Sequence, residues 1–134
     1  MPGERYRETM AWLQKAADDL RTARVVTAVA PPLIEAALFH CQQATEKALK
    51  AFLTAHDTPF RKTHDLDELG MACERLDASL QNVTGPARDL TVFAWEFRYP
   101  GSGEPPSEAE TRAAIALADA VLSAVRQRLA TMAQ

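Results

Sequence analysis

Four polar side chains suited to binding a phosphate or another anionic partner recur at helical spacing in one stretch of the chain. His40, Gln43, Lys47 and Lys50 are three, four and three residues apart, so a helix places them in a single stripe. An imidazole, an amide and two ammonium groups can donate hydrogen bonds to phosphate oxygens. The same stripe can instead be a polar face whose cations form ion pairs with Asp or Glu, and the sequence leaves both interpretations open.

A second candidate pair lies directly before Pro100, where Arg98 is followed by Tyr99. A guanidinium can bind a phosphate through two parallel hydrogen bonds, and a tyrosine ring can stack on a base. The structural alternative is an anchor at a helix end, with the arginine paired to an acidic side chain and the tyrosine packed. The candidate nucleotide- or RNA-binding residues are therefore His40, Gln43, Lys47, Lys50, Arg98 and Tyr99.

The three histidines do not predict a metal site. Helical metal sites commonly present two ligands one turn apart, as Glu-x-x-His or a histidine pair, and neither pattern occurs here. We therefore expect no metal and no cofactor. His64 lies between Thr63 and Asp65 at the start of a predicted helix, which favours a capping or loop-fixing role over catalysis.

Length and charge limit the class of protein. The 134 residues suit one domain, residues 1–134. With 15 basic and 18 acidic residues the net charge is −3, whereas proteins that coat nucleic acid usually carry a basic surface. Any RNA contact must therefore depend on a local patch. Cys41 and Cys73 lie in apolar helical runs and predict buried, reduced thiols. Because no signal peptide or apolar membrane span is evident, we expect a cytoplasmic protein without membrane contact.

Hydrophobic periodicity and helix-breaking residues predict the elements that position these groups. In the first helix Tyr6, Met10, Leu13 and Leu20 share one apolar face. The predicted helices span residues 5–29, 32–55, 66–79, 86–97 and 108–132.

Proline and capping residues set the predicted helix ends. Pro32 and Pro86 are expected at first helical positions, the latter after a break at residues 82–85. Asp65 with Glu68, and Ser107 with Glu110, have the spacing of capping boxes. Long helices with short connections predict an all-α fold, an antiparallel four- to five-helix up-and-down bundle.

Residues 39–51, which read FHCQQATEKALKA, closely resemble the signature helix of the prokaryotic HEPN family. Three further features occur where that family has them. They are AADDL with a nearby alanine at 16–23, KTHDL at 62–66, and RYP at 98–100. The resemblance covers about residues 8–130 and is most specific when these motifs are taken together. We call residues 39–51 the signature segment.

The resemblance implies a helical bundle that forms a homodimer. Such proteins are often encoded beside a minimal nucleotidyltransferase and form a toxin–antitoxin-like complex with it. Some relatives are ribonucleases, and others are non-catalytic modules that bind nucleotides or RNA.

The ribonuclease relatives use an arginine followed four to six residues later by a histidine, brought together across a dimer. Here an arginine with that spacing would lie at 33–35, 49–51 or 57–59, and none of these positions is arginine. Arg98 is followed by no histidine through Pro105. Metal-free RNA cleavage needs a group that titrates near neutrality, usually histidine. The sequence therefore predicts no catalytic residue of the family's kind.

The leading hypothesis is a non-catalytic HEPN-like module that homodimerises and pairs with a minimal nucleotidyltransferase, and contributes to a nucleotide or RNA site. One alternative is a metal-independent ribonuclease toxin that combines Arg98 with His40 or His64. Another is a structural bundle without a ligand.

Overall fold

The computed structural model describes residues 3–94 and 106–132, and all regular structure in this part of the chain is helical. The prediction of an all-α bundle is confirmed. In chain order the elements are α1 (Glu4–Ala28), α2 (Ile34–Ala55), α3 (Leu66–Leu76), the 3-10 helix η1 (Ala78–Leu80), α4 (Gln81–Ala87), the 3-10 helix η2 (Arg88–Ala94) and α5 (Glu108–Met132).

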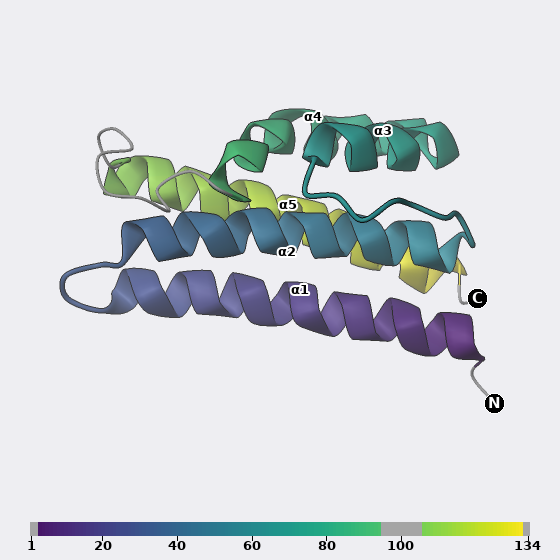
Figure 1. Ribbon diagram of the computed structural model, residues 1–134, viewed down its shortest axis with the longest axis horizontal. Coiled ribbons are helices and arrows are strands. Elements are labelled where there is room, and N and C mark those ends of the chain that lie inside the picture. Colours follow the sequence, from purple (N-terminus) through teal and green to yellow (C-terminus); the bar gives the residue numbers. More distant parts are fainter. Residues whose placement is uncertain (1–2, 95–105, 133–134) are drawn as a thin grey trace.

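Helix α2 lies at the centre of the bundle, where it contacts α1, α3, α5 and η2. Figure 1 shows α1 and α2 as an antiparallel hairpin, with α5 alongside them. The short helix α3 packs on α2, whereas α4 packs on α5 and α3. The N- and C-terminal ends of the chain lie at the same end of the bundle. This arrangement surrounds the signature segment with other helices.

Small side chains let α1 and α2 approach closely. Ala16 and Ala23 in α1 are completely buried, as are Ala37, Ala44 and Ala48 in α2. The distance between two packed helices depends on the side chains at their contact. Alanine at these positions brings the backbones together, so that longer side chains beside the contact reach from one helix to the other.

The short helices differ from the prediction. Helix α3 ends at Leu76 instead of Ser79, because Asp77 accepts a hydrogen bond from the Ser79 N–H and so begins η1. The helix predicted at 86–97 does not begin at Pro86, which lies inside α4, and Arg88–Ala94 form the 3-10 helix η2. Residues 95–97 of this prediction lie outside the described residues. The expected break at 82–85 is helical.

Burial explains why α4 forms across this expected break. Leu80, Thr84, Ala87 and Leu90 are all buried and are four, three and three residues apart. Packing of this face outweighs the cost of Pro86, which removes one backbone donor in the last turn of a seven-residue helix.

Two predicted core positions near the start of α1 are exposed instead. Tyr6 and Met10 belong to the apolar stripe of α1, yet they are 53% and 45% exposed. Helix α2 begins at Ile34 and not at Pro32.

Candidate functional site

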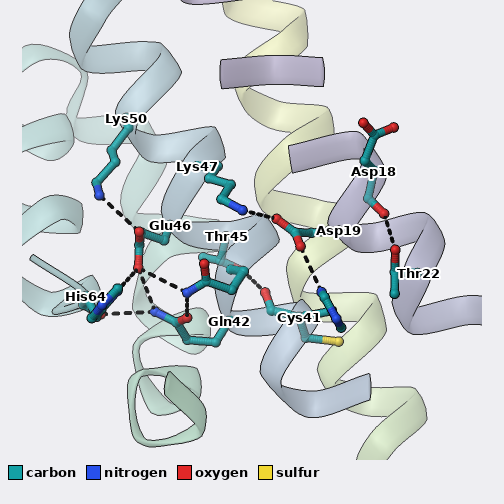
Figure 2. Close-up of polar contacts among 12 residues, drawn as sticks. Asp18, Asp19, Thr22, Cys41, Gln42, Thr45, Glu46, Lys47, Lys50 and His64 are labelled. Atoms are coloured by element: carbon teal, nitrogen blue, oxygen red, sulfur yellow. Dashed lines mark hydrogen bonds and ion pairs between the residues drawn. The ribbon is translucent and has the colours of Figure 1, made fainter. Parts of the chain in front are cut away.

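His40 and Lys47, the first and third residues of the polar stripe, are bound to a carboxylate of α1. Asp19 is 8% exposed; its Oδ1 lies 2.8 Å from His40 Nδ1 and its Oδ2 accepts a 2.5 Å hydrogen bond from Lys47 Nζ. His40 and Lys47 are seven residues apart, about two helical turns, so both face α1. Figure 2 shows the bond from Lys47 to Asp19. This carboxylate links the signature segment to α1.

Gln43 and Lys50, the second and fourth residues of the stripe, contact a carboxylate of α2 itself. Glu46 is 3% exposed and accepts a 2.9 Å hydrogen bond from Lys50 Nζ, one turn along the helix. Its other oxygen, Oε1, lies 2.7 Å from His64 Nδ1 and 3.5 Å from Gln43 Nε2. The side chains of Lys50 and His64 therefore converge on one buried carboxylate (Figure 2).

Gln42 completes this cluster and was not among the predicted site residues. Its side chain is fully buried, and its Nε2 donates to Glu46 Oε1 at 3.1 Å and to the backbone oxygen of His64 at 3.0 Å. Its Oε1 accepts a 2.7 Å hydrogen bond from Gln43. A buried amide is tolerated because its donors and acceptor are all paired. The loop before α3 is thereby fixed to α2.

Opposing effects set the pKa of Glu46. Burial by itself raises the pKa of this carboxyl, but hydrogen bonds from His64, Lys50 and Gln42, with the charge of Lys50, outweigh it and lower the pKa below its ordinary value of 4.5. Glu46 therefore remains an anion at neutral pH and holds the Lys50 ammonium group and the His64 ring.

Lys50 is enclosed further by two aromatic rings. Its Nζ lies 5.4 Å from the centroid of Trp12 and 5.7 Å from that of Phe60, within the range of cation–π attraction. The two rings meet edge to face, with centroids 6.2 Å apart. Lys50 is only 5% exposed, so its ammonium group would have to leave Glu46 to reach a ligand.

The loop carrying His64 is fixed where it enters α3. Asp65 caps α3 by accepting the N–H groups of Asp67 and Glu68, and the Leu66 N–H donates to Thr91 Oγ1 in η2. The capping box predicted at Asp65 and Glu68 is incomplete, because the Glu68 carboxylate pairs with Arg61. At α5 the predicted box is present.

At the start of α5, Ser107 and Glu110 exchange the two hydrogen bonds of the predicted capping box. The interpretation of His64 as a loop-fixing residue agrees with its bonds to Glu46 and Gln42.

The other candidate groups add no reactive site to the described residues. Arg98 and Tyr99 lie outside these residues. No group of three or more His, Cys, Asp or Glu side chains within 3–94 and 106–132 is arranged to hold a metal ion. Cys41 and Cys73 are buried, and burial raises the pKa of each thiol to about 12. At neutral pH they are protonated and weakly nucleophilic.

Sequence reasoning did not select the two acidic residues that organise the site. One signal was available for Glu46, because it lies four residues before Lys50 and four after Gln42. No helical spacing of this kind links Asp19 to His40 or Lys47, which are 21 and 28 residues away.

The model of the HEPN domain family matches residues 9–128, a range that reaches from the first turns of α1 into the last turns of α5. The chain belongs to the HEPN family. No curated protein and no solved structure matches it. Family membership makes this a HEPN domain, in which the signature segment forms the centre of α2. No described helix is both long enough and apolar enough to cross a membrane.

Proposed function

We propose that this HEPN domain is a non-catalytic interaction module that homodimerises and pairs with a minimal nucleotidyltransferase in a toxin–antitoxin-like complex. The observation that carries this proposal is the pairing of the signature segment with Asp19 and Glu46. His40 and His64 each contact one of these carboxylates through Nδ1. The polar stripe thus stabilises a scaffold, and family membership supports the choice of partner.

The arginine–histidine spacing supports the same conclusion. No histidine follows an arginine at the spacing of the ribonuclease relatives. The ring of His56, the third histidine, packs on Phe52 with centroids 4.3 Å apart. The three histidines thus have packing and pairing partners within the bundle.

A nucleotide or RNA contribution remains part of the proposal, with His40, Gln43, Lys47, Lys50, Arg98 and Tyr99 as its residues. Lys47 is the more accessible of the two lysines, with 22% of its side chain exposed against 7% for Lys50. We expect ATP to raise the melting temperature, and Lys47→Ala to abolish that shift. Lys62→Ala, in the exposed loop, is the matched control and should retain it.

Co-expression with a neighbouring minimal nucleotidyltransferase tests the main proposal. We expect the two chains to co-purify, with light scattering showing two HEPN chains in each complex. A HEPN chain that stays monomeric and purifies without the nucleotidyltransferase contradicts the proposal.

A second candidate function is RNA cleavage by Arg98 together with His64. The observation that favours it is the hydrogen bond from the Leu66 N–H to Thr91 Oγ1. This bond holds the His64 loop against η2, the segment that leads to Arg98. The imidazole of His64 is also 58% exposed. A histidine and an arginine from these two segments could act on one phosphodiester.

Incubation with cellular RNA distinguishes the two functions. The ribonuclease candidate predicts cleavage that is lost in both Arg98→Ala and His64→Ala, while His56→Ala retains it. Absence of cleavage above a heat-inactivated sample excludes this candidate and leaves the non-catalytic proposal.

A further inference from the structure

An apolar groove lies between the first turns of α1 and the last turns of α5. The start of α1 and the end of α5 lie at the same end of the bundle (Figure 1). The groove is open to solvent and has a volume of about 490 Å³. It lies in a different part of the molecule from the clusters around Asp19 and Glu46, none of whose side chains lines it. Most of its wall is formed by Tyr6, Met10, Leu13, Leu129, Ala130 and Met132.

Two apolar helix stripes run past the end of the core into this groove. In α1, Leu13 is buried, whereas Met10 and Tyr6, one and two turns earlier, are 45% and 53% exposed. In α5, Val125 is completely buried, whereas Met132, two turns later, is 48% exposed. Grouped apolar side chains in contact with water mark interaction sites more often than scattered ones do.

Positive charge at the groove indicates what kind of partner fits. Arg5 and Arg126 are its charged lining residues, and no carboxylate lines it. Arg5 lies 4.0 Å from Asp57 in a largely exposed pair, which contributes little. No ion pair joins Arg126 to another residue of the described chain. An acidic partner is therefore attracted and a basic one repelled.

We propose that this groove binds an acidic amphipathic helix of a partner protein. The apolar face of that helix covers Tyr6, Met10 and Met132, and its flanking carboxylates face Arg5 and Arg126. Recognition of this kind uses apolar anchors at helical spacing, and methionine adapts its shape to them. A second copy of the chain fits less well, because a two-fold contact centred on the groove sets arginines against arginines.

Two synthetic helical peptides test the proposal. Both carry the same leucine stripe, and they differ only in having glutamates or lysines beside it. Fluorescence anisotropy with the full chain should show the glutamate peptide binding roughly tenfold or more tightly than the lysine peptide. The preference should weaken as salt is added.

Substitutions locate the binding. Met10→Ser should weaken binding of the glutamate peptide roughly tenfold, and Arg126→Glu should reverse the preference between the peptides. The matched controls are Met71→Ser, an equally exposed methionine in α3, and Arg112→Glu, an exposed arginine at the other end of α5. Both controls should bind as the native chain does.

Three results would overturn the inference. They are absence of peptide binding, equal affinity for the two peptides, and binding that persists in Met10→Ser. Peptide-free dimerisation that Met10→Ser abolishes would also overturn it, because a second copy would then occupy the groove. Circular dichroism verifies the fold of each variant, and Tyr6→Ser replaces Met10→Ser if the latter unfolds.

Discussion

The middle of α2 and the start of α1 reverse the usual relation between residue type and burial. In the middle of α2, Glu46 is 3% exposed and contacts Lys50 and His64, and Asp19 of α1 is 8% exposed. At the start of α1, Tyr6 and Met10 are about half exposed. A buried charge is costly unless it is paired, and an apolar side chain is buried only where something covers it. In this bundle the available partners decide which side chains are inside.

The largest expected effect comes from removing the anion at the centre of the polar cluster. Glu46→Ala leaves Lys50 buried without a counter-charge, which typically costs about 3–5 kcal/mol of the free energy of unfolding. Urea denaturation measures this cost. Glu35→Ala is the control, because Glu35 lies exposed on the same helix and its loss should change stability by less than about 0.5 kcal/mol. Equal effects of the two substitutions would show that the cluster does not stabilise the fold.

A smaller effect is expected from the carboxylate on α1. Asp19→Ala removes the partner of His40 and Lys47, and we expect a loss of about 1–3 kcal/mol because both partners keep some contact with water. Asp18→Ala is a close control, since this exposed neighbour accepts only local hydrogen bonds. If Asp18→Ala destabilised the protein as much, the contact between α1 and α2 would not be the cause.

Acid should abolish the difference in stability between the native protein and the Glu46→Gln variant. A carboxyl whose pKa is lowered by folding contributes stability that is fully present above its unfolded pKa and is lost as the pH falls through its folded pKa. The pKa of Glu46 is lowered from 4.5, so the gap in urea midpoint should be constant near neutral pH and should shrink below pH 4.5. A gap that stays constant in acid would contradict this account. Glu35→Gln should follow the native protein throughout.

The smallest effect on stability is expected at the exposed groove. Met10→Ser should change the free energy of unfolding by less than about 0.5 kcal/mol. Leu13→Ala, one turn further along the same stripe, should cost about 2–4 kcal/mol because Leu13 is buried. Thermal melting of the two variants measures the contrast. A large loss of stability in the Met10→Ser variant would mean that the groove is part of the core.

Much of the fold could be predicted from local pattern. The three long helices, α1, α2 and α5, were predicted within two residues at each end, because they combine long periodic runs with proline or capping residues. The segment from Asp77 to Ala94 was not, because its glycine and proline suggested a break. Thr84 and Ala87 are buried there, and packing overrode the local preference.

The candidate site was predicted only in part. The sequence placed His40, Gln43, Lys47 and Lys50 on one face of a helix, and ion pairing with acidic residues was one of the two interpretations left open. It did not identify the residues that pair with them. That choice depends on how α1 and the loop before α3 are rotated against α2, and no periodicity within a single helix encodes this rotation.

The sequence by itself determined that this chain is helical, where its long helices lie and which family it belongs to. Spacing along one helix is enough for the first two conclusions, since neighbouring turns fix which side chains share a face. The family follows from the motifs that resemble it and from the match of its model to residues 9–128. Only the tertiary structure decided that the polar stripe pairs with Asp19 and Glu46, two buried carboxylates, while the apolar stripe of α1 continues into solvent at Met10 and Tyr6. Burial depends on what packs against a face, and the packing partners come from distant parts of the chain.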